Sequence, residues 1–255
     1  MVRNKRVAIV LPAYNAAKTL ETTYSEIPHD IVDQIILVDD ASTDKTAAIA
    51  RSLKIETIVH AQNKGYGGNQ KTCYRAALES NADIIVMLHP DYQYTPKLIT
   101  AMAYLLESGE FDVVLGSRIL GGKAINGGMP VYKYISNRIL TLLQNLIIGA
   151  KLSEYHTGYR AYTRSVLQSI PWIENSDDFV FDNQFLSQAI YAGFRIGEIT
   201  CPAKYFSEAS SINFSRSIKY GIGCLLTAVQ FRLGRLHLFT AKIFAFDPSP
   251  SHLSR

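Results

Sequence analysis

Five short apolar runs alternate with helical patterns through the first half of the chain. The runs are rich in valine and isoleucine and span 7–11, 34–38, 57–59, 83–88 and 112–116. Near-continuous apolar runs of this length are typical of strands buried on both faces of a parallel sheet. Segments with helical spacing lie between them, at 15–27, 42–53, 65–80 and 95–109. This order predicts an α/β domain with a Rossmann-like, mostly parallel sheet flanked by helices.

Longer helical patterns replace this alternation after residue 122. The second half predicts a long helix at 128–152, a loop leading into a short helix at 154–167, a helix at 181–194 and a strand at 195–202. Because no linker rich in Pro, Ser and Gly separates the halves, we expect one domain over residues 1–215. We expect a helical segment over 216–246 and a flexible tail over 247–255.

The composition excludes several classes of protein. Hydrophobic residues make up 47% of the 255 residues and charged residues 19%, close to the globular average. A net charge of only +4, without a long block of Lys and Arg, argues against nucleic-acid binding. Three widely spaced cysteines, Cys73, Cys201 and Cys224, indicate buried thiols in a reducing compartment. The first apolar run is too short for a signal peptide, so we expect a cytoplasmic protein, free or at the cytoplasmic face of a membrane.

The segment 217–246 is apolar but interrupted by polar residues. The interruptions are Gln230, Arg232, Arg235 and Lys242, and no run of about 18 apolar residues is present. Two interpretations stand side by side. Either the segment lies in a membrane interface as an amphipathic helix with its basic residues facing headgroups, or it forms a pair of helices packed on the core.

Polar residues follow each of the five apolar runs, at 12–15, 39–43, 63–69, 89–93 and 116–122. In doubly wound sheets ligands bind beyond the carboxyl ends of the strands, so these segments form the expected binding site. Asp39 and Asp40 together exceed what capping the next helix requires. An acidic strand end in this topology commonly binds a ribose or a base.

The segment NKGYGGN is a glycine-rich turn that enters a helix. Its backbone could cradle a phosphate, with Lys64 reaching a diphosphate. Glycines that only fit a tight turn, beside a solvated lysine, explain the same residues equally well. The segment matches neither the Walker pattern nor G-x-G-x-x-G, so the signal by itself is weak.

The segment HPDYQ offers ligands for a metal ion. Asp91 and Gln93 project from the strand end, and oxygen ligands there suit Mg²⁺ or Mn²⁺ bound together with substrate phosphates. His89 is either a further ligand or a hydrogen-bonded histidine at the strand end. After the fifth run, Arg118 is placed to bind phosphate oxygens, with a surface ion pair as the alternative.

Six motifs in one order resemble family 2 glycosyltransferases of the GT-A fold. They are LPAYNAAKTL, ILVDDASTDKT, NKGYGGNQ, PDYQ, GSR and TGYRAYTR, and the resemblance covers about residues 5 to 205. Within the family, the sequence is most similar to the polyprenyl- and dolichyl-phosphate sugar transferases. The resemblance implies a hexosyltransferase with a nucleotide-sugar donor, a divalent metal (Mg²⁺ or Mn²⁺) and inversion at the sugar carbon.

The resemblance also implies roles for individual residues. Donor binding falls to eight of them: Pro12, Tyr14, Asn15, Asp39, Asp40, Lys64, Gly65 and Gly68. Asp91 matches the second carboxylate of the family's Asp-x-Asp metal motif, with Gln93 and His89 as the other candidate ligands. Arg118 and Ser136 match positions that bind the acceptor phosphate, and Lys133 is their basic neighbour. Asp91, Arg118 and Asp182 form the expected catalytic set.

Departures from the family pattern bear on the metal and on the acceptor. His89 replaces the first Asp of Asp-x-Asp, so we expect little metal to bind before the donor supplies its diphosphate. Gln184 stands where the family often has Glu, which favours a phosphate acceptor that needs no general base. If the acceptor were a sugar hydroxyl, Asp182 or Glu154 would be the candidate base.

Three functions fit these motifs. The first is metal-dependent, inverting transfer of a sugar from a nucleotide sugar to polyprenyl or dolichyl phosphate. The second is transfer by a family 2 enzyme to a hydroxyl of a saccharide or another small acceptor. The third is non-catalytic binding of a nucleotide sugar, which the incomplete Asp-x-Asp suggests. Analogy at the level of the fold does not separate them.

Overall fold

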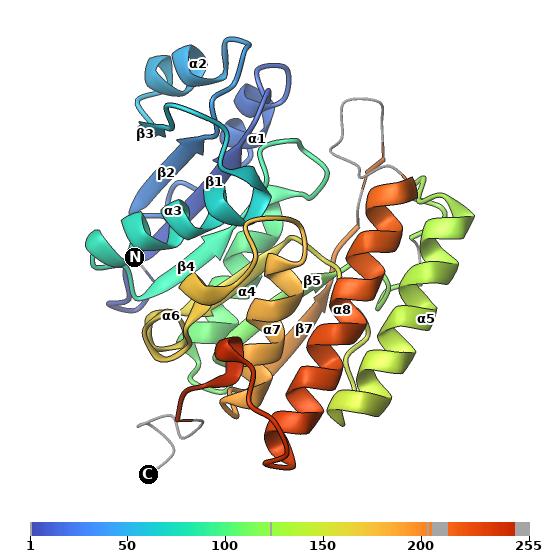
Figure 1. Ribbon diagram of the computed structural model, residues 1–255. Coiled ribbons are helices and arrows are strands. Elements are labelled where there is room, and N and C mark those ends of the chain that lie inside the picture. The colour runs from blue at the N-terminus through green and yellow to red at the C-terminus, as the bar shows by residue number, and fades with distance from the viewer. Residues whose placement is uncertain (1, 123, 203, 206–213, 248–255) are drawn as a thin grey trace.

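The computed structural model contains one seven-stranded sheet with helices on both faces (Figure 1). It describes residues 2–122, 124–202, 204–205 and 214–247. The strands are β1 Val7–Ala13, β2 Gln34–Asp39, β3 Glu56–Val59, β4 Ile84–Met87, β5 Val113–Ser117, β6 Arg160–Thr163 and β7 Ile196–Thr200. Their order across the sheet is β3-β2-β1-β4-β6-β5-β7. All six predicted strands are present.

One strand lies where the sequence predicts a loop. β6 runs antiparallel between β4 and β5, whereas every other strand pair in this sheet is parallel. The prediction was wrong because β6 begins with a charged residue, Arg160, which hides the strand pattern. Arg160 is fully buried, and its guanidinium donates to three backbone carbonyls, those of Tyr155, Thr157 and Asp182.

Two apolar clusters fill the space between the sheet and its helices. The helices are α1 Leu20–Ser25, α2 Thr46–Ser52, α3 Gly65–Glu79, α4 Ile99–Glu107, α5 Val131–Ile148, α6 Arg164–Ser169, α7 Phe181–Tyr191 and α8 Phe214–Arg235. Val10 and Ile36 belong to the cluster that includes α3, α6, α7 and α8. Their neighbours Ile9 and Leu37 belong to the cluster that includes α1, α2 and α4. Because successive strand residues point to opposite faces, a sheet covered on both faces requires apolar residues at nearly every strand position.

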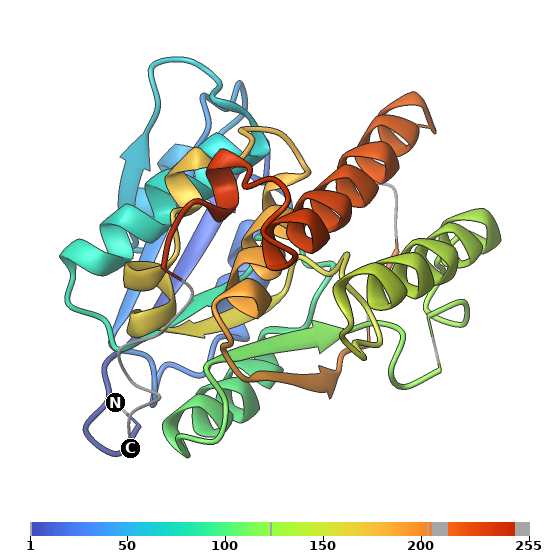
Figure 2. The ribbon, with the colours of Figure 1, turned by 60° about the horizontal axis from the view of Figure 1, so that its bottom comes forward.

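The C-terminal segment consists of one long helix and a short turn of 3-10 helix, η3 Lys242–Phe244. α8 packs along α5 and α7, and both views of the ribbon show α5 and α8 side by side (Figures 1 and 2). Ala228 and Phe231 of α8 join the core, so core packing accounts for one face of the helix. Among the described residues, no helix is both long enough and apolar enough to cross a bilayer. Of the predicted tail at 247–255, residues 248–255 lie outside the described part of the chain.

The three cysteines are buried and free, which confirms their predicted burial. Burial raises the pKa of the Cys201 and Cys224 thiols to about 12. A thiol that ionises so reluctantly is a poor nucleophile, so the cysteines take no part in the candidate chemistry.

Candidate active site

The ends of β1 and β2 are joined by hydrogen bonds between their loops. The Asn15 N–H donates to Ser42 Oγ at 2.8 Å, and the Thr43 N–H donates to Asn15 Oδ1 at 2.9 Å. Asp39 is buried and accepts from the Ser42 N–H at 3.1 Å and from its hydroxyl at 2.5 Å. Two predicted donor-binding residues, Asn15 and Asp39, are therefore held by their neighbours at the carboxyl end of the sheet. Of the other two in this region, Pro12 is buried within β1 and Tyr14 is exposed.

Asp40 ties β2 to the glycine-rich turn. Its buried carboxylate accepts from the Lys64 N–H at 2.8 Å and from the Gly65 N–H at 3.1 Å. His60 Nδ1 lies 2.7 Å from the same carboxylate, and His60 Nε2 lies 2.9 Å from Thr72 Oγ1 of α3. With these three protein partners Asp40 positions the turn. A direct contact of Asp40 with the donor stays a prediction.

The glycines of this turn let a distant backbone segment approach the start of α3. A Cβ on Gly67 would lie 2.3 Å from the Ser176 carbonyl oxygen, and one on Gly65 would lie 2.7 Å from that of Asp177. The N–H groups of Gly67 and Gly68 donate to the Asp177 carbonyl at 2.7 and 3.3 Å. The protein itself therefore occupies the N–H groups that would cradle a phosphate. Close packing accounts for these glycines, and donor contacts of Gly65 and Gly68 stay predictions.

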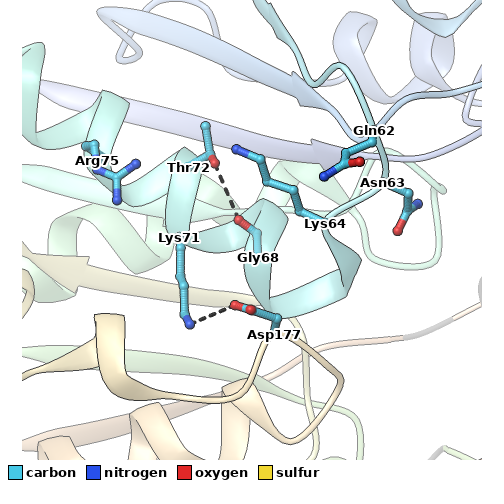
Figure 3. A pocket seen from close by; sticks show the side chains of 8 residues that line it. All are labelled: Gln62, Asn63, Lys64, Gly68, Lys71, Thr72, Arg75 and Asp177. Atoms are coloured by element: carbon cyan, nitrogen blue, oxygen red, sulfur yellow. Dashed lines mark hydrogen bonds and ion pairs between the residues drawn. The ribbon is translucent and has the colours of Figure 1, made fainter.

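Lys64 lines a polar pocket at the start of α3 (Figure 3). The lining carries three cations, Lys64, Lys71 and Arg75, and one carboxylate, Asp177. The Lys71 ammonium pairs with Asp177 at 2.7 Å and donates to the Asn175 carbonyl at 2.5 Å. An excess of cations makes the pocket favourable for an anion. Lys64 and Gly68 thus line one pocket, and a contact of Lys64 with the donor diphosphate stays a prediction.

A chain of hydrogen bonds links the end of β4 to α7. The Tyr66 hydroxyl donates to Asp182 Oδ2 at 2.6 Å, and His89 Nε2 lies 2.9 Å from the same hydroxyl. Because that hydroxyl has one proton, His89 Nε2 must supply the proton of the second bond. Burial, followed by the Asp182 charge, raises the pKa of Tyr66 well above its usual range. His89 is thus a hydrogen-bonded histidine, and within the described residues only its Nδ1 is left for a metal.

Asp182 stands at the start of α7 and is 5% exposed. Its Oδ2 accepts from Tyr66, whereas its buried Oδ1 has no hydrogen-bond partner among the described residues. Arg160 donates to the Asp182 backbone carbonyl at 2.6 Å and brings a positive charge close to the carboxylate. A buried carboxylate oxygen of this kind is a position where a ligand can donate a hydrogen bond.

Asp91 and Gln93 are buried beyond the end of β4. Asp91 Oδ1 accepts from the Gln93 N–H at 3.1 Å, and the Gln93 carbonyl accepts from the Lys204 N–H at 3.0 Å. In the part of the chain that the structure describes, no three His, Cys, Asp or Glu side chains come together to hold a metal. A metal at Asp91 would therefore take the rest of its ligands from a substrate, as Mg²⁺ commonly does.

Arg118 follows β5 and forms a buried ion pair with Glu154. Its backbone N–H and its Nε–H donate to the carboxylate at 2.8 and 2.9 Å, and Nη2 contacts the same group. The remaining contacts run from Nη2 to the His156 carbonyl at 2.9 Å and from Nη1 to the Tyr205 hydroxyl at 3.0 Å. The ion pair considered as the alternative from the sequence is present, but it is buried between β5 and the loop before β6 and does not lie on the surface. Within the described residues these bonds engage four of the five guanidinium N–H groups, which leaves one for a ligand.

The charge of Glu154 is stabilised by this pairing. Burial alone would raise the pKa of the Glu154 carboxyl, but the Arg118 charge and hydrogen bonds outweigh it and lower the pKa. Asn137 of α5 adds a hydrogen bond to Glu154 Oε1 at 2.8 Å. A carboxylate with a lowered pKa and several donors is a poor general base, so the structure disfavours that role for Glu154.

Lys133 and Ser136 lie on the first two turns of α5, the helix whose Asn137 contacts Glu154. Burial and the Arg118 charge lower the pKa of Lys133, so Lys133 and Arg118 are close enough to repel each other. Because Glu154 pairs with Arg118, the charge of Lys133 adds to a pair that is already neutral, which leaves positive charge for an incoming anion. Ser136 is exposed on α5.

Three residues that build the site were missed by the sequence reasoning, namely Tyr66, His156 and Arg160. Tyr66 is the only large apolar side chain in NKGYGGN, which is the one signal that could have marked it. His156 Nδ1 lies 2.8 Å from the Tyr220 hydroxyl of α8, and burial lowers the pKa of His156 to about 4. Local sequence patterns do not show that His156 contacts Tyr220 or that Arg160 is buried, so only the folded structure could identify these two residues.

The motifs, fold and site together define a glycosyltransferase. The chain matches the family model described as Glycosyl transferase family 2 over residues 8–170, and it belongs to this family. The UDP-N-acetylglucosamine--dolichyl-phosphate N-acetylglucosaminyltransferase of Methanococcus voltae is 26% identical over 250 residues, 91% of this chain and 98% of that protein. The polyprenol monophosphomannose synthase of Mycolicibacterium smegmatis is 24% identical over 203 residues, 76% of each chain.

Solved structures confirm the predicted GT-A fold. The crystal structure of glucosyl-3-phosphoglycerate synthase from Mycobacterium tuberculosis with Mn²⁺, uridine diphosphate and glucosyl-3-phosphoglycerate superimposes with a TM-score of 0.66. It is 16% identical, and the match covers 93% of this chain and 82% of that chain. Family and fold therefore favour an enzyme over the non-catalytic binding protein.

Proposed function

We propose that this enzyme transfers a hexose from a nucleotide sugar to the phosphate of polyprenyl or dolichyl phosphate, with inversion at the sugar carbon. The observation that carries the acceptor is that Arg118, paired with Glu154, lies close enough to Lys133 for the two positive charges to repel each other. A phosphate group adds the negative charge that this cluster lacks and accepts hydrogen bonds from both cations. The dolichyl-phosphate acceptor named for the Methanococcus voltae relative supports the same choice.

A phosphate acceptor also fits the scarcity of usable bases. Its oxygen is already anionic, so attack on the sugar carbon needs no proton acceptor. Glu154 is committed to Arg118. Gln184 is a neutral amide and cannot act as a general base, and its Oε1 accepts from the Ser176 N–H at 2.7 Å. In this proposal the acceptor phosphate is oriented by Arg118, Lys133 and Ser136. Holding the phosphate in position for attack is how these residues increase the rate.

The donor is proposed to lie along the strand ends from Asn15 and Asp39 to Asp91. Asp91, with Gln93 and Nδ1 of His89, would hold Mg²⁺ or Mn²⁺ beside the donor diphosphate. A carboxylate, an amide and one imidazole nitrogen are a donor set that fits such an ion once phosphate oxygens complete it. When bound, the ion neutralises charge on the departing diphosphate.

Transfer to a hydroxyl is the second candidate, and Asp182 is the observation that favours it. Its Oδ1 is buried and without a hydrogen-bond partner among the described residues, so it could accept a proton from an acceptor hydroxyl. Oδ2 is held by Tyr66, which would keep the carboxylate oriented.

We also propose that the enzyme works at the cytoplasmic face of a membrane and contacts it peripherally. A polyprenyl chain resides in the bilayer, so a transferase must meet its acceptor at the surface. The free, buried thiols are consistent with a reducing compartment.

The donor is tested by a thermal-shift panel of nucleotide sugars, each with Mn²⁺, Mg²⁺ or EDTA. A ligand that binds the native state raises the melting temperature by mass action. We expect a shift with one nucleotide sugar plus metal, and little shift with the metal alone, because the protein supplies an incomplete ligand set. A large shift with metal alone would contradict the proposed metal site.

The acceptor is tested by comparing a short-chain polyprenyl phosphate with the matching polyprenol. We expect transfer to the phosphate only, and Lys133→Gln should raise the KM for the phosphate roughly tenfold, because it removes one charge-assisted contact. The matched control is Lys5→Gln, at an exposed lysine near the N-terminus. Transfer to the alcohol, lost in Asp182→Asn while donor binding persists, would establish the hydroxyl mechanism instead.

A further inference from the structure

Helix α5 turns polar side chains to the protein and apolar side chains to the outside. Its buried positions include Thr141 and Gln144, whereas Leu142 is 59% exposed and Leu146 is 67% exposed. Ile139 is exposed on the same side of the helix. A helix on the surface of a protein in water normally shows the reverse pattern. The outer side of α5 is therefore built for surroundings less polar than water.

Helix α8 carries a second apolar stripe. Ile218, Ile222, Leu226 and Val229 are all exposed, and their spacing of four, four and three residues places them on one side of the helix. The opposite side includes Ala228, which packs in the core. α8 thus combines a face that completes the fold with a face that has no partner among the described residues.

The two stripes point outward together. α5 and α8 are in contact and run parallel, since a Cβ on Gly221 would meet Leu140 and Arg232 Nε donates to the Ile147 carbonyl at 2.7 Å. α8 also packs against α7, and Figures 1 and 2 show α5 and α8 side by side from two directions. We call the exposed apolar residues of the two helices the α5–α8 face.

All charged residues of helices α5 and α8 are basic. α5 contains Lys133 and Arg138, and α8 contains four further Lys or Arg residues, whereas neither helix contains Asp or Glu. Arg138, Arg216 and Lys219 are exposed. Apolar stripes on two helices whose charged residues are all basic fit an anionic lipid surface, because apolar side chains enter the interface while cations meet the headgroups. A second copy of the chain would bring like charges together.

The α5–α8 face adjoins the proposed acceptor site. Asn137 of α5 donates to Glu154 at 2.8 Å, and the Tyr220 hydroxyl of α8 lies 2.8 Å from His156 Nδ1. Both helices therefore touch the segment that holds Arg118. A surface docked on this face would present lipid headgroups next to the two cations of the acceptor site.

We propose that the α5–α8 face docks on a membrane surface that contains anionic lipid. This inference rests on the proposed lipid-phosphate acceptor and adds the surface, the two helices and the lipid class. It explains why apolar side chains replace polar ones on the outer side of α5, and why the C-terminal segment is both core-packed and amphipathic.

The test is sedimentation of the full chain with vesicles of phosphatidylcholine, with or without roughly one third phosphatidylglycerol. We expect binding to the anionic vesicles that weakens as salt is added, since headgroup attraction is screened. Leu142→Glu/Leu146→Glu on α5 and Ile222→Glu/Leu226→Glu on α8 should each weaken binding at least about tenfold, because each places charge in the interface. Tyr104→Glu and Ile173→Glu, at exposed apolar residues outside the face, are controls that keep wild-type binding.

Several outcomes would overturn the proposal. They are binding by the α5 and α8 variants equal to wild type, no binding to either vesicle, or a concentration-dependent dimer that buries the face instead. Melting temperatures equal to wild type show that a variant is folded, and Lys219→Gln, which leaves the apolar stripe intact, should still lower anionic binding. Transfer to a short-chain, water-soluble polyprenyl phosphate separates the two proposals. This transfer should survive in the variants of the α5–α8 face. If wild-type protein binds vesicles but does not catalyse this transfer, the proposed acceptor is refuted and the docking face is not.

Discussion

The donor end and the acceptor end of the site are built from contacts that differ in sequence separation. At the donor end, Asn15 is held by Ser42 and Thr43, 27 and 28 residues away, which lie at the end of the adjacent strand. At the acceptor end, Arg118 is held by Glu154 and Tyr205, 36 and 87 residues away. The first arrangement follows from the winding of a parallel sheet, whereas the second depends on the inserted strand β6 and on the helices around it.

This difference predicts how each half responds to mutation. Donor-end side chains sit at strand tips that the sheet would position without them, so their loss should affect binding and turnover more than stability. Acceptor-end side chains form a buried charged cluster, so their loss should unfold the protein as well.

The largest effect is expected on stability from Arg118→Met. The change leaves Glu154 buried without its cation, which should lower the free energy of unfolding by about 3–5 kcal/mol. Urea denaturation measures it. The double variant Arg118→Met/Glu154→Leu should recover much of the loss, because it removes the unpaired charge. A single variant as stable as wild type would show that the cluster does not behave as a buried pair.

Next in size is the loss of activity in Asp91→Asn. Removing the proposed metal carboxylate should lower kcat/KM at least about a hundredfold, through lost stabilisation of the leaving diphosphate. The metal-dependent part of the donor-induced thermal shift should disappear, while the stability without ligand changes little. Asp30→Asn, at an exposed position, serves as control. Retention of the metal-dependent shift would remove Asp91 from the metal site.

A third effect concerns pH. Burial holds the pKa of His156 at about 4, against 6.5 for a free histidine. The unfolded chain therefore binds a proton that the folded chain does not, and stability falls as pH drops from about 6.5 to about 4. The contribution is roughly 3 kcal/mol at most. His156→Gln should flatten this part of the stability curve, whereas His29→Gln on the surface should leave it as in wild type. An unchanged curve in His156→Gln would assign the pH dependence to other groups.

The smallest effect is expected from Tyr66→Phe, which tests the link between the two halves. The variant keeps the ring but removes the hydroxyl between His89 and Asp182, at an expected cost of about 1–2 kcal/mol in stability. If His89 Nδ1 binds the metal, Tyr66→Phe should also weaken metal-dependent donor binding, because it releases the histidine ring. Weaker stability with unchanged metal dependence would limit Tyr66 to a structural role.

Much of the fold followed from local patterns. The five apolar runs marked five strands because a sheet covered on both faces tolerates few polar side chains within it, and the segment 195–202 marked a sixth. Asp39, Asn15 and Asp91 could be placed near one another because the carboxyl ends of parallel strands share one edge of the sheet. The order of the motifs along the chain was sufficient to recognise the family, which the family model confirms.

What the sequence by itself determined is thus the sheet, its binding edge and the residue types at the strand ends. Tertiary structure alone decided the partners. Arg160 is compatible with a buried strand only because its guanidinium donates to three backbone carbonyls, two in the preceding loop and one at the start of α7. Arg118 meets Glu154 because the fold brings these two residues together. The apolar side of α5 is exposed because the fold places no other segment of the described chain against it. The physical reason is that local patterns report the burial of a segment, whereas the pairing of buried charges depends on the path of the whole chain.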